Sequence, residues 1–299
     1  MTQDKLRNRL KMAICALSLV LALSLSAGML LLRDIGDASF RAGEGDEVYS
    51  REQIDKFTTG VLIAVQNSPL SAGTAGADMI FIASFDSFGQ RLSVAALHRE
   101  LLLGGERLSD IYKNDGAGGL VNAVNDSFGL DIKYYACTDT LSLGAMIDLL
   151  GGIRVKVDFA EAAYINKALG EGSVKAGRVT LNGSASMVYA MDEISGEEQM
   201  GGLKRSLELV ESAIMNMRKT ATKEAMLPLL SLVSGSIRTN LDYSVLHDIG
   251  YEIIKAEEME YKSICIPADG TWDTDENGMI RVNDLETNKK QLYDGLYKK

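Results

Sequence analysis

Two hydrophobic patterns alternate along the chain after residue 56. One is typical of buried strands and the other of amphipathic helices. Short continuous apolar runs predict strands covered on both faces, and these runs are Val61–Val65, Met79–Ala83, Leu92–Leu97, Ile153–Val157 and Ser263–Ile266. Apolar residues at three- and four-residue spacing predict helices, and these segments are Gly119–Phe128, Leu141–Leu150, Ser184–Met191, Leu203–Met217, Lys223–Val233, Val245–Lys255 and Asn288–Leu296. The alternation predicts an α/β fold, a central mixed β-sheet flanked by helices, in one domain.

An uninterrupted apolar run lies near the N-terminus. Met12–Leu32 contains 21 residues without a charge, and at about 1.5 Å per residue such a helix spans the roughly 30 Å hydrocarbon core of a membrane. Four basic residues precede it: Lys5, Arg7, Arg9 and Lys11. A cleaved signal peptide is the alternative, because Ser26–Gly28 has the small side chains of a cleavage site, but the apolar run continues beyond that point.

The basic flank predicts the orientation of the chain, since such residues stay on the cytoplasmic side of a membrane. We therefore expect a single-pass protein of the cell membrane. Its predicted parts are a cytoplasmic tail (residues 1–11), a transmembrane anchor (12–32), a juxtamembrane stalk (33–56) and an extracellular domain (57–299).

Charge and cysteine content restrict the function classes. The chain has 31 basic and 41 acidic residues and a net charge of −10; the first 11 residues carry +3, which leaves −13 on the rest. Nucleic acid is an unsuitable partner, because its affinity comes mainly from neutralised phosphates. Three cysteines exclude a disulfide-dense scaffold. Cys137 and Cys265 follow the predicted anchor and are able to pair only if the fold brings them together.

Familiar catalytic motifs are absent from the sequence. It has no G-x-x-x-x-G-K-[ST] phosphate loop, no G-x-S-x-G elbow, no C-x-x-C and no H-E-x-x-H. Gly116–Gly119 lacks the spacing of a dinucleotide-binding loop, so we interpret it as a turn that leads into a helix. His98 follows a predicted strand, where α/β proteins place ligands, although we favour an ordinary strand-end residue.

One acidic segment fits two structures. Asp273–Asp284 has the spacing of a calcium-binding loop, with oxygen-bearing side chains at positions 1, 3 and 5, glycine at 6 and a carboxylate at 12. Position 12 is aspartate rather than the usual glutamate, and a strand-like segment precedes the loop where a helix is expected. The alternative is a β-hairpin that turns at Asn277-Gly278, a strong two-residue turn signal.

The order and spacing of several segments resemble a known family. They are Val61–Ser68, Ala77–Ile80, Leu92–Glu100, Gly118–Tyr135, Met146–Ile153, Leu181–Gly183, Val188–Ala190 and Arg238–Leu241. Together they are similar to the LytR-CpsA-Psr family of cell-envelope proteins. The resemblance implies a phosphotransferase that moves a glycopolymer, such as teichoic acid or capsule, from a polyprenyl-pyrophosphate lipid to peptidoglycan outside the membrane. It also implies an apolar groove for the lipid, and arginines and Mg²⁺ that stabilise the charge of the pyrophosphate.

The resemblance assigns roles to individual residues. Asp78 matches a metal-binding aspartate, and Asn67 stands where the family has a second one, so the Mg²⁺ site has lost a carboxylate. Arg99 matches a catalytic, substrate-binding arginine. A second such arginine corresponds to Arg205, although the neighbouring Lys204 is an alternative for substrate binding.

The family's R-x-R pair falls on Met191 and Glu193. Two lost hydrogen bonds to charged groups are worth about 3–6 kcal/mol, or roughly 10²–10⁴ in rate or affinity. The first of three hypotheses is therefore a working transferase in which other cations, Lys113, Arg154, Lys156 or Lys204, compensate. The second is a catalytically weak or inactive paralogue that binds polyprenyl lipid or glycan, or partners an intact relative. The third is a regulatory or scaffold domain.

Overall fold

The computed structural model describes residues 47–70, 75–170, 172–191, 200–220, 236–241 and 258–298, with the single residues 245, 249 and 253. The predicted anchor at 12–32, the tail before it, most of the stalk, the helix predicted at 223–233 and Glu193 lie outside the described residues. The helix predicted at 245–255 lies mostly outside them. Within the described ranges, no helix is both long and apolar enough to cross a membrane.

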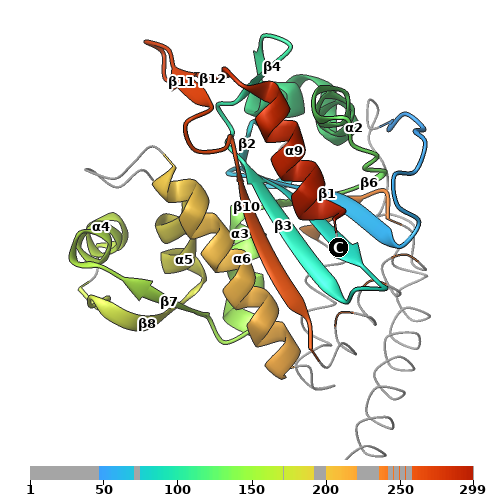
Figure 1. The fold of residues 1–299 in the computed structure, drawn as a ribbon. Helices are drawn as coiled ribbons and strands as arrows, with labels where there is room; N and C mark the ends of the chain where they lie inside the picture. The colour runs from blue at the N-terminus through green and yellow to red at the C-terminus, as the bar shows by residue number, and fades with distance from the viewer. Residues whose placement is uncertain are drawn as a thin grey trace, which may run out of the picture.

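A six-stranded sheet forms the centre of the domain (Figure 1), in the order β10-β3-β2-β1-β6-β9. Its strands are β1 (Thr58–Gln66), β2 (Ala77–Asp86), β3 (Arg91–Leu97), β6 (Tyr134–Asp139), β9 (Arg238–Thr239) and β10 (Glu260–Ile266). β1 pairs parallel with β6, β3 pairs parallel with β10, and β2 runs antiparallel between β1 and β3. The sheet is therefore mixed, as predicted. β1, β3, β6 and β10 all end at the same edge, where β2 begins.

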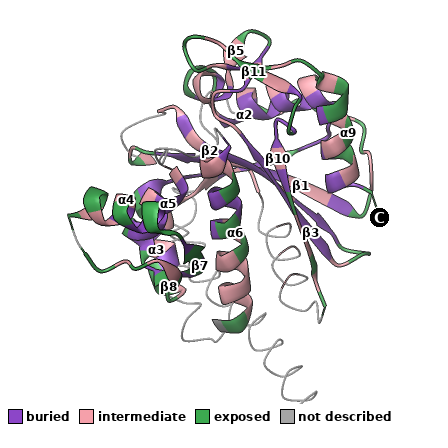
Figure 2. Ribbon diagram, turned by 60° about the vertical axis from the view of Figure 1, so that its left-hand side comes forward, coloured by how far each residue is buried: buried purple, intermediate pink, exposed green. Residues whose placement is uncertain are grey.

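Helices cover both faces of this sheet. One core joins α2 (Leu108–Phe128) and α9 (Leu285–Leu296) to strand residues such as Leu62 and Ile82. The other joins α3 (Thr140–Leu149), α5 (Gly183–Met191) and α6 (Gly201–Thr220) to alternate strand residues such as Val65 and Phe81. Figure 2 shows the buried strands between the two groups of helices. Because both faces are covered, the strands appear in the sequence as continuous apolar runs.

Several elements differ from the sequence expectation; α4 (Phe159–Leu169), for example, was not predicted. β6 is a central strand that the sequence analysis missed, because its residues YYACTD form no apolar run. α2 begins at Leu108 rather than Gly119, and its kink at Gly116, with φ of 70°, shows that the glycine turn leads only the second half of the helix. β7 (Ile153–Val157) is a strand but not part of the main sheet, since it pairs with β8 (Gly177–Leu181) in a separate ribbon.

The hairpin interpretation of the acidic segment is confirmed. β11 (Trp272–Thr274) pairs antiparallel with β12 (Ile280–Val282) around Asn277-Gly278. Asp284 instead caps α9, and hydrogen bonds from Thr287 lower the pKa of its carboxyl. Within the hairpin, Asp275 accepts the backbone N–H groups of Asn277 and Met279, and Asp273 accepts from Asn283.

Cys137 and Cys265 are free thiols. They lie on β6 and β10, with β1, β2 and β3 between them. Four strand spacings of about 4.8 Å separate them by roughly 19 Å, whereas a disulfide requires Cα atoms within about 7 Å. Burial raises the pKa of the Cys265 thiol. The fold therefore keeps these two cysteines from pairing.

The contact between α3 and α5 depends on Gly183. A Cβ atom added at Gly183 would overlap the backbone of Gly144 on α3. The backbone N–H of Gly183 also donates to Asp148 Oδ1 at 2.7 Å. The missing side chain of Gly183 therefore allows the two helices to approach closely.

Replacing Gly183 with alanine is expected to lower the free energy of unfolding by about 1–3 kcal/mol, the usual cost of overpacking. The reason is that the added methyl group meets backbone, which cannot move aside as a flexible side chain can. Urea unfolding followed by circular dichroism measures the change. Gly172→Ala is the control, because nothing lies within 4 Å of its added methyl group. Equal stability of Gly183→Ala and the unaltered protein would contradict the tight α3–α5 contact.

Candidate functional site

Polar residues gather where the strands of the main sheet end. Asn67 follows β1, Arg99 closely follows β3, and Thr140 follows β6, while Asp78 is the second residue of β2. The registers align these ends, since Ile80 pairs with Leu97 across β2 and β3. α/β proteins bind ligands in crevices outside the carboxyl ends of their strands. This edge is therefore the candidate site.

An ion pair joins two of the predicted site residues. Arg99 Nη1 lies 2.6 Å from Asp78 Oδ1, and Arg99 Nε lies 3.4 Å from Glu100 Oε1. Glu100 in turn meets Arg107, whose pKa is raised by Asp110 and Glu100. The side chain of Arg99 remains 42% exposed and that of Asp78 18%. Arg99 can therefore reach an anion, although Asp78 competes for it.

A small cavity of about 60 Å³ adjoins this pair, and we call it the Arg99 pocket. It is lined by Asp78, Met79, Ile80, Leu97, His98, Arg99, Ala190, Met191, Gly202, Leu203 and Ser206. Liquid water occupies about 30 Å³ per molecule, so the cavity has room for only a small group. His98 Nδ1 accepts a hydrogen bond from the backbone N–H of Glu100 at 3.2 Å, which also fits a strand-end role for this residue.

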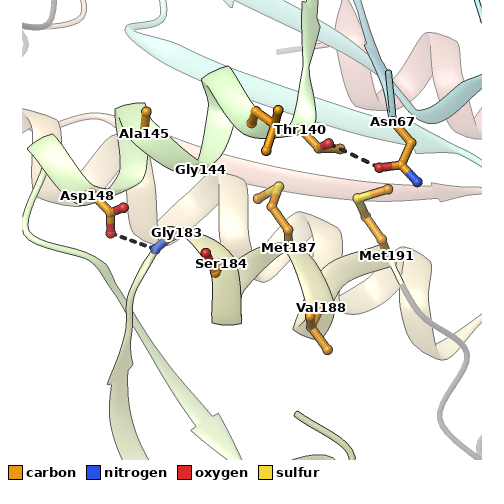
Figure 3. Close-up of a pocket in the computed structure, with 11 residues that line it drawn as sticks. Asn67, Thr140, Gly144, Ala145, Asp148, Gly183, Ser184, Met187, Val188 and Met191 are labelled. Carbon is orange, nitrogen blue, oxygen red and sulfur yellow. Dashed lines mark hydrogen bonds between the residues drawn. The ribbon is translucent and has the colours of Figure 1, made fainter. Parts of the chain in front are cut away.

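A larger cavity of about 400 Å³ lies between α3 and α5, and we call it the Asn67 pocket (Figure 3). Its lining residues are Asn67, Thr140, Leu141, Gly144, Ala145, Asp148, Gly183, Ser184, Met187, Val188 and Met191. Thr140 Oγ1 donates to Asn67 Oδ1 at 3.2 Å. The sequence analysis missed Thr140, Asp148 and Ser184 as lining residues, because only the close approach of α3 and α5 brings them together.

Met191 lines both pockets. It is the last residue of α5, and Figure 3 shows its side chain next to Asn67. The family resemblance places an arginine at this position. A thioether is at most a weak hydrogen-bond acceptor and carries no charge, so it cannot grip a phosphate as a guanidinium does. The one residue that the two pockets share is therefore uncharged.

The implied Mg²⁺ does not fit the donors that are present. Asp78 is the single carboxylate at this junction among the described lining residues, and Arg99 already pairs with it. Asn67 lines the other pocket and accepts from Thr140. Within the described part of the chain, no three His, Cys, Asp or Glu side chains gather as a metal site. Mg²⁺ prefers an octahedron of oxygen ligands, so we derive no step that passes through it.

Arg205 lies beside the site rather than in it. Its side chain is 4% exposed, and its Nε donates a hydrogen bond to the backbone carbonyl of Tyr189. The guanidinium lies 5.6 Å from the centre of the Tyr189 ring. Burial, followed by the hydrogen bond to Glu208, raises the pKa of that tyrosine. Arg205 lines neither pocket, whereas its neighbour Ser206 lines the Arg99 pocket.

The other candidate cations also line neither pocket. Lys204 is exposed on α6, near Cys265. Lys113 is exposed on α2, and Arg154 and Lys156 are exposed on β7. Neither pocket includes any of these four among its lining residues. Arg99 is therefore the one arginine that lines these two pockets in the described part of the chain.

Comparison with known proteins identifies the family of this chain. The sequence model of the LytR_cpsA_psr family matches residues 56–294. The chain belongs to the LytR_cpsA_psr family. Regulatory protein MsrR of Staphylococcus aureus is 22% identical over 234 residues, which cover 75% of this chain and 70% of MsrR. TagU of Bacillus licheniformis, a polyisoprenyl-teichoic acid–peptidoglycan teichoic acid transferase, is 22% identical over 169 residues, 56% of this chain and 52% of TagU.

Solved structures of TagT from Bacillus subtilis share the LytR_cpsA_psr fold with this chain. TagT bound to LI-WTA has a TM-score of 0.66 at 17% identity, covering 85% of this chain and 98% of TagT. TagT with bound octaprenyl pyrophosphate lipid has a TM-score of 0.62 at the same identity and coverage.

Replacing Arg205 with alanine is expected to lower the free energy of unfolding by about 2–4 kcal/mol, because a buried side chain and its hydrogen bond to Tyr189 are lost together. Chemical denaturation measures this change. The exposed neighbour provides the control, and Lys204→Ala is expected to stay within about 0.5 kcal/mol of the unaltered protein. An Arg205→Ala protein of unchanged stability that had lost ligand affinity would instead identify Arg205 as a binding residue.

Proposed function

We propose that this protein binds a polyprenyl-pyrophosphate-linked glycopolymer at the edge of its main sheet and transfers it to peptidoglycan only weakly. The names of its relatives support this ligand class, since TagU is a teichoic acid transferase and TagT has been solved with octaprenyl pyrophosphate. Arg99 is the residue that would hold the pyrophosphate, because its half-exposed guanidinium lines the Arg99 pocket.

The position of Met191 carries this proposal. It lines both the Asn67 pocket and the Arg99 pocket, where an arginine would contact both. Transfer breaks the phosphoanhydride bond, joins the polymer phosphate to a glycan hydroxyl and releases prenyl monophosphate and the hydroxyl proton. Negative charge concentrates on the phosphates during this step, and preorganised cations stabilise it. One missing charge-assisted bond costs about 1.5–3 kcal/mol, or roughly 10- to 100-fold in rate.

The proposed setting is the outer face of the cell membrane. Residues 12–32 would form the anchor, with the basic tail in the cytoplasm and the domain outside. A polyprenyl lipid in the same membrane would then meet the site without leaving its leaflet.

Introducing an arginine at the junction should restore transfer. In Met191→Arg we expect a rise of about 10- to 100-fold, the value of one hydrogen bond to a charged group. The assay uses the full chain in detergent, an octaprenyl-pyrophosphate-linked glycan and peptidoglycan strands, and it follows the release of octaprenyl phosphate. Met217→Arg near the end of α6 adds the same charge eleven residues, or roughly 16 Å, beyond Ser206 and is the control.

Binding is measured in parallel with octaprenyl pyrophosphate alone, and Arg99→Ala should weaken it about tenfold or more. Rapid transfer by the unaltered protein would contradict the weak-transfer part of the proposal. Loss of both binding and transfer in every variant would leave the regulatory or scaffold hypothesis.

The Asp78–Arg99 ion pair leads to a separate prediction about ligand affinity. Asp78→Asn should raise the affinity for octaprenyl pyrophosphate up to about fivefold, because a partly exposed ion pair worth up to about 1 kcal/mol no longer competes for Arg99. Isothermal titration with and without Mg²⁺ measures the effect. A Mg²⁺-dependent fall in affinity would contradict it and would identify Asp78 as a metal ligand.

A further inference from the structure

The β7–β8 ribbon carries an unusual outer face. Along β7, residues Ile153, Val155 and Val157 are buried, whereas Arg154 and Lys156 are exposed. Along β8, Arg178 and Thr180 are exposed between less exposed neighbours. Alternate residues of a strand point to opposite faces. The three cations therefore share one face, and the apolar residues of β7 pack into the core.

The register places two of these cations against each other. Lys156 is directly opposite Arg178, and Arg154 is opposite Thr180. Residues opposite one another in an antiparallel pair have Cβ atoms about 4.5–5.5 Å apart, and like charges at such positions are destabilising. The ribbon therefore has a charge pair that weakens its own folding.

No acidic side chain of the described ranges forms an ion pair with Arg154, Lys156 or Arg178. Asp158 directly follows β7, but its carboxylate accepts the backbone N–H of Glu161 and caps α4 (Phe159–Leu169). The cations are thus available to an external anion. On a chain with 41 acidic and 31 basic residues, three cations on one face with no acidic partner among the described residues depart from the general charge.

The ribbon is continuous with the Asn67 pocket. β7 begins shortly after α3 ends, and β8 leads into α5, so Ile153 pairs with Leu181 where the ribbon meets the two helices. Figure 3 shows Asp148 and Gly183 at the end of the pocket away from Asn67. Arg154, the cation nearest this junction along β7, is six residues beyond Asp148. A chain-like ligand leaving this end of the pocket meets the ribbon.

We propose that the outer face of the β7–β8 ribbon binds the phosphodiester backbone of an anionic glycopolymer through Arg154, Lys156 and Arg178. Guanidinium and ammonium groups donate strong hydrogen bonds to phosphate oxygens. Successive cations on β7 are about 6.6 Å apart at 3.3 Å per residue, and the third extends the patch across the ribbon. A repeating polyanion supplies several phosphates to such a patch, whereas a lone phosphate meets only one or two cations. The choice of polymer rests on the proposed function.

The test is charge reversal at the three positions together, R154E/K156E/R178E, in the full chain in a non-ionic detergent. The probe is poly(glycerol phosphate) without a prenyl group, and binding is followed by fluorescence anisotropy in 50 mM salt. Because three contacts are lost and replaced by repulsion, the variant should lose roughly 10- to 100-fold in affinity. Binding by the unaltered protein should also weaken between 50 and 200 mM salt, because counterions are released on polyanion binding.

A matched control distinguishes the effect of the ribbon cations on polymer binding from the effect of net charge. K113E/K133E/K290E makes the same change in total charge at three exposed lysines outside the ribbon. We expect less than a twofold effect on polymer binding. An equal loss in both triple variants, or no loss in the ribbon variant, would overturn the proposal. So would affinity for phosphatidylglycerol vesicles that depends on the ribbon while affinity for the polymer does not.

Two further measurements distinguish unfolding from a loss of binding, and a failure of this inference from a failure of the proposed function. Lys156→Glu creates an opposite-charge pair with Arg178, so its melting temperature should rise while polymer binding falls, which excludes unfolding as the cause. Octaprenyl pyrophosphate binding should be unchanged in the ribbon variant. Polymer binding without lipid binding would contradict the proposed function alone, and lipid binding without ribbon-dependent polymer binding would contradict this inference alone.

Discussion

Apolar side chains must cover both faces of the main sheet, and this constraint places the candidate site at its edge. Alternate residues of β1 and β2 enter two separate cores, one under α2 and α9 and one under α3, α5 and α6. A sheet filled on both faces leaves its polar strand ends as the positions where a ligand can approach backbone and side chains together. Asn67, Asp78 and Arg99 come from three such ends. The same packing that stabilises the fold therefore brings them to one edge.

The charges of the molecule are arranged unevenly around that edge. Arg99 is half exposed but paired with Asp78, and Arg205 is buried against Tyr189. Met191 occupies the junction of the two pockets, where a cation would serve both. Three exposed cations without an acidic partner in the described ranges lie instead on the β7–β8 ribbon. This arrangement suits retention of an anionic polymer better than stabilisation of the concentrated charge of phosphoryl transfer, and it underlies both proposals.

Close helix packing then shapes the larger pocket. Gly183 allows α3 and α5 to approach each other, and Asp148 ties the start of α5 to α3 through the Gly183 N–H. Asn67 and Thr140 form one part of the lining and Asp148 with Ser184 another, with methionine side chains between them. A pocket of mixed polarity results, and its boundary depends on backbone contacts as much as on side chains.

The sequence alone determined the elements with strong local signals. Continuous apolar runs predicted β1, β2, β3 and β10, Asn277-Gly278 predicted its hairpin, and the order of motifs predicted the family, because each depends on neighbours in the chain. Only the tertiary structure decided that β6 lies inside the sheet, that Cys137 and Cys265 are far apart, and that Arg205 is buried and hydrogen-bonded to Tyr189. Strand order, register and burial depend on partners distant in sequence, and local composition carries no signal of which partner a side chain will meet.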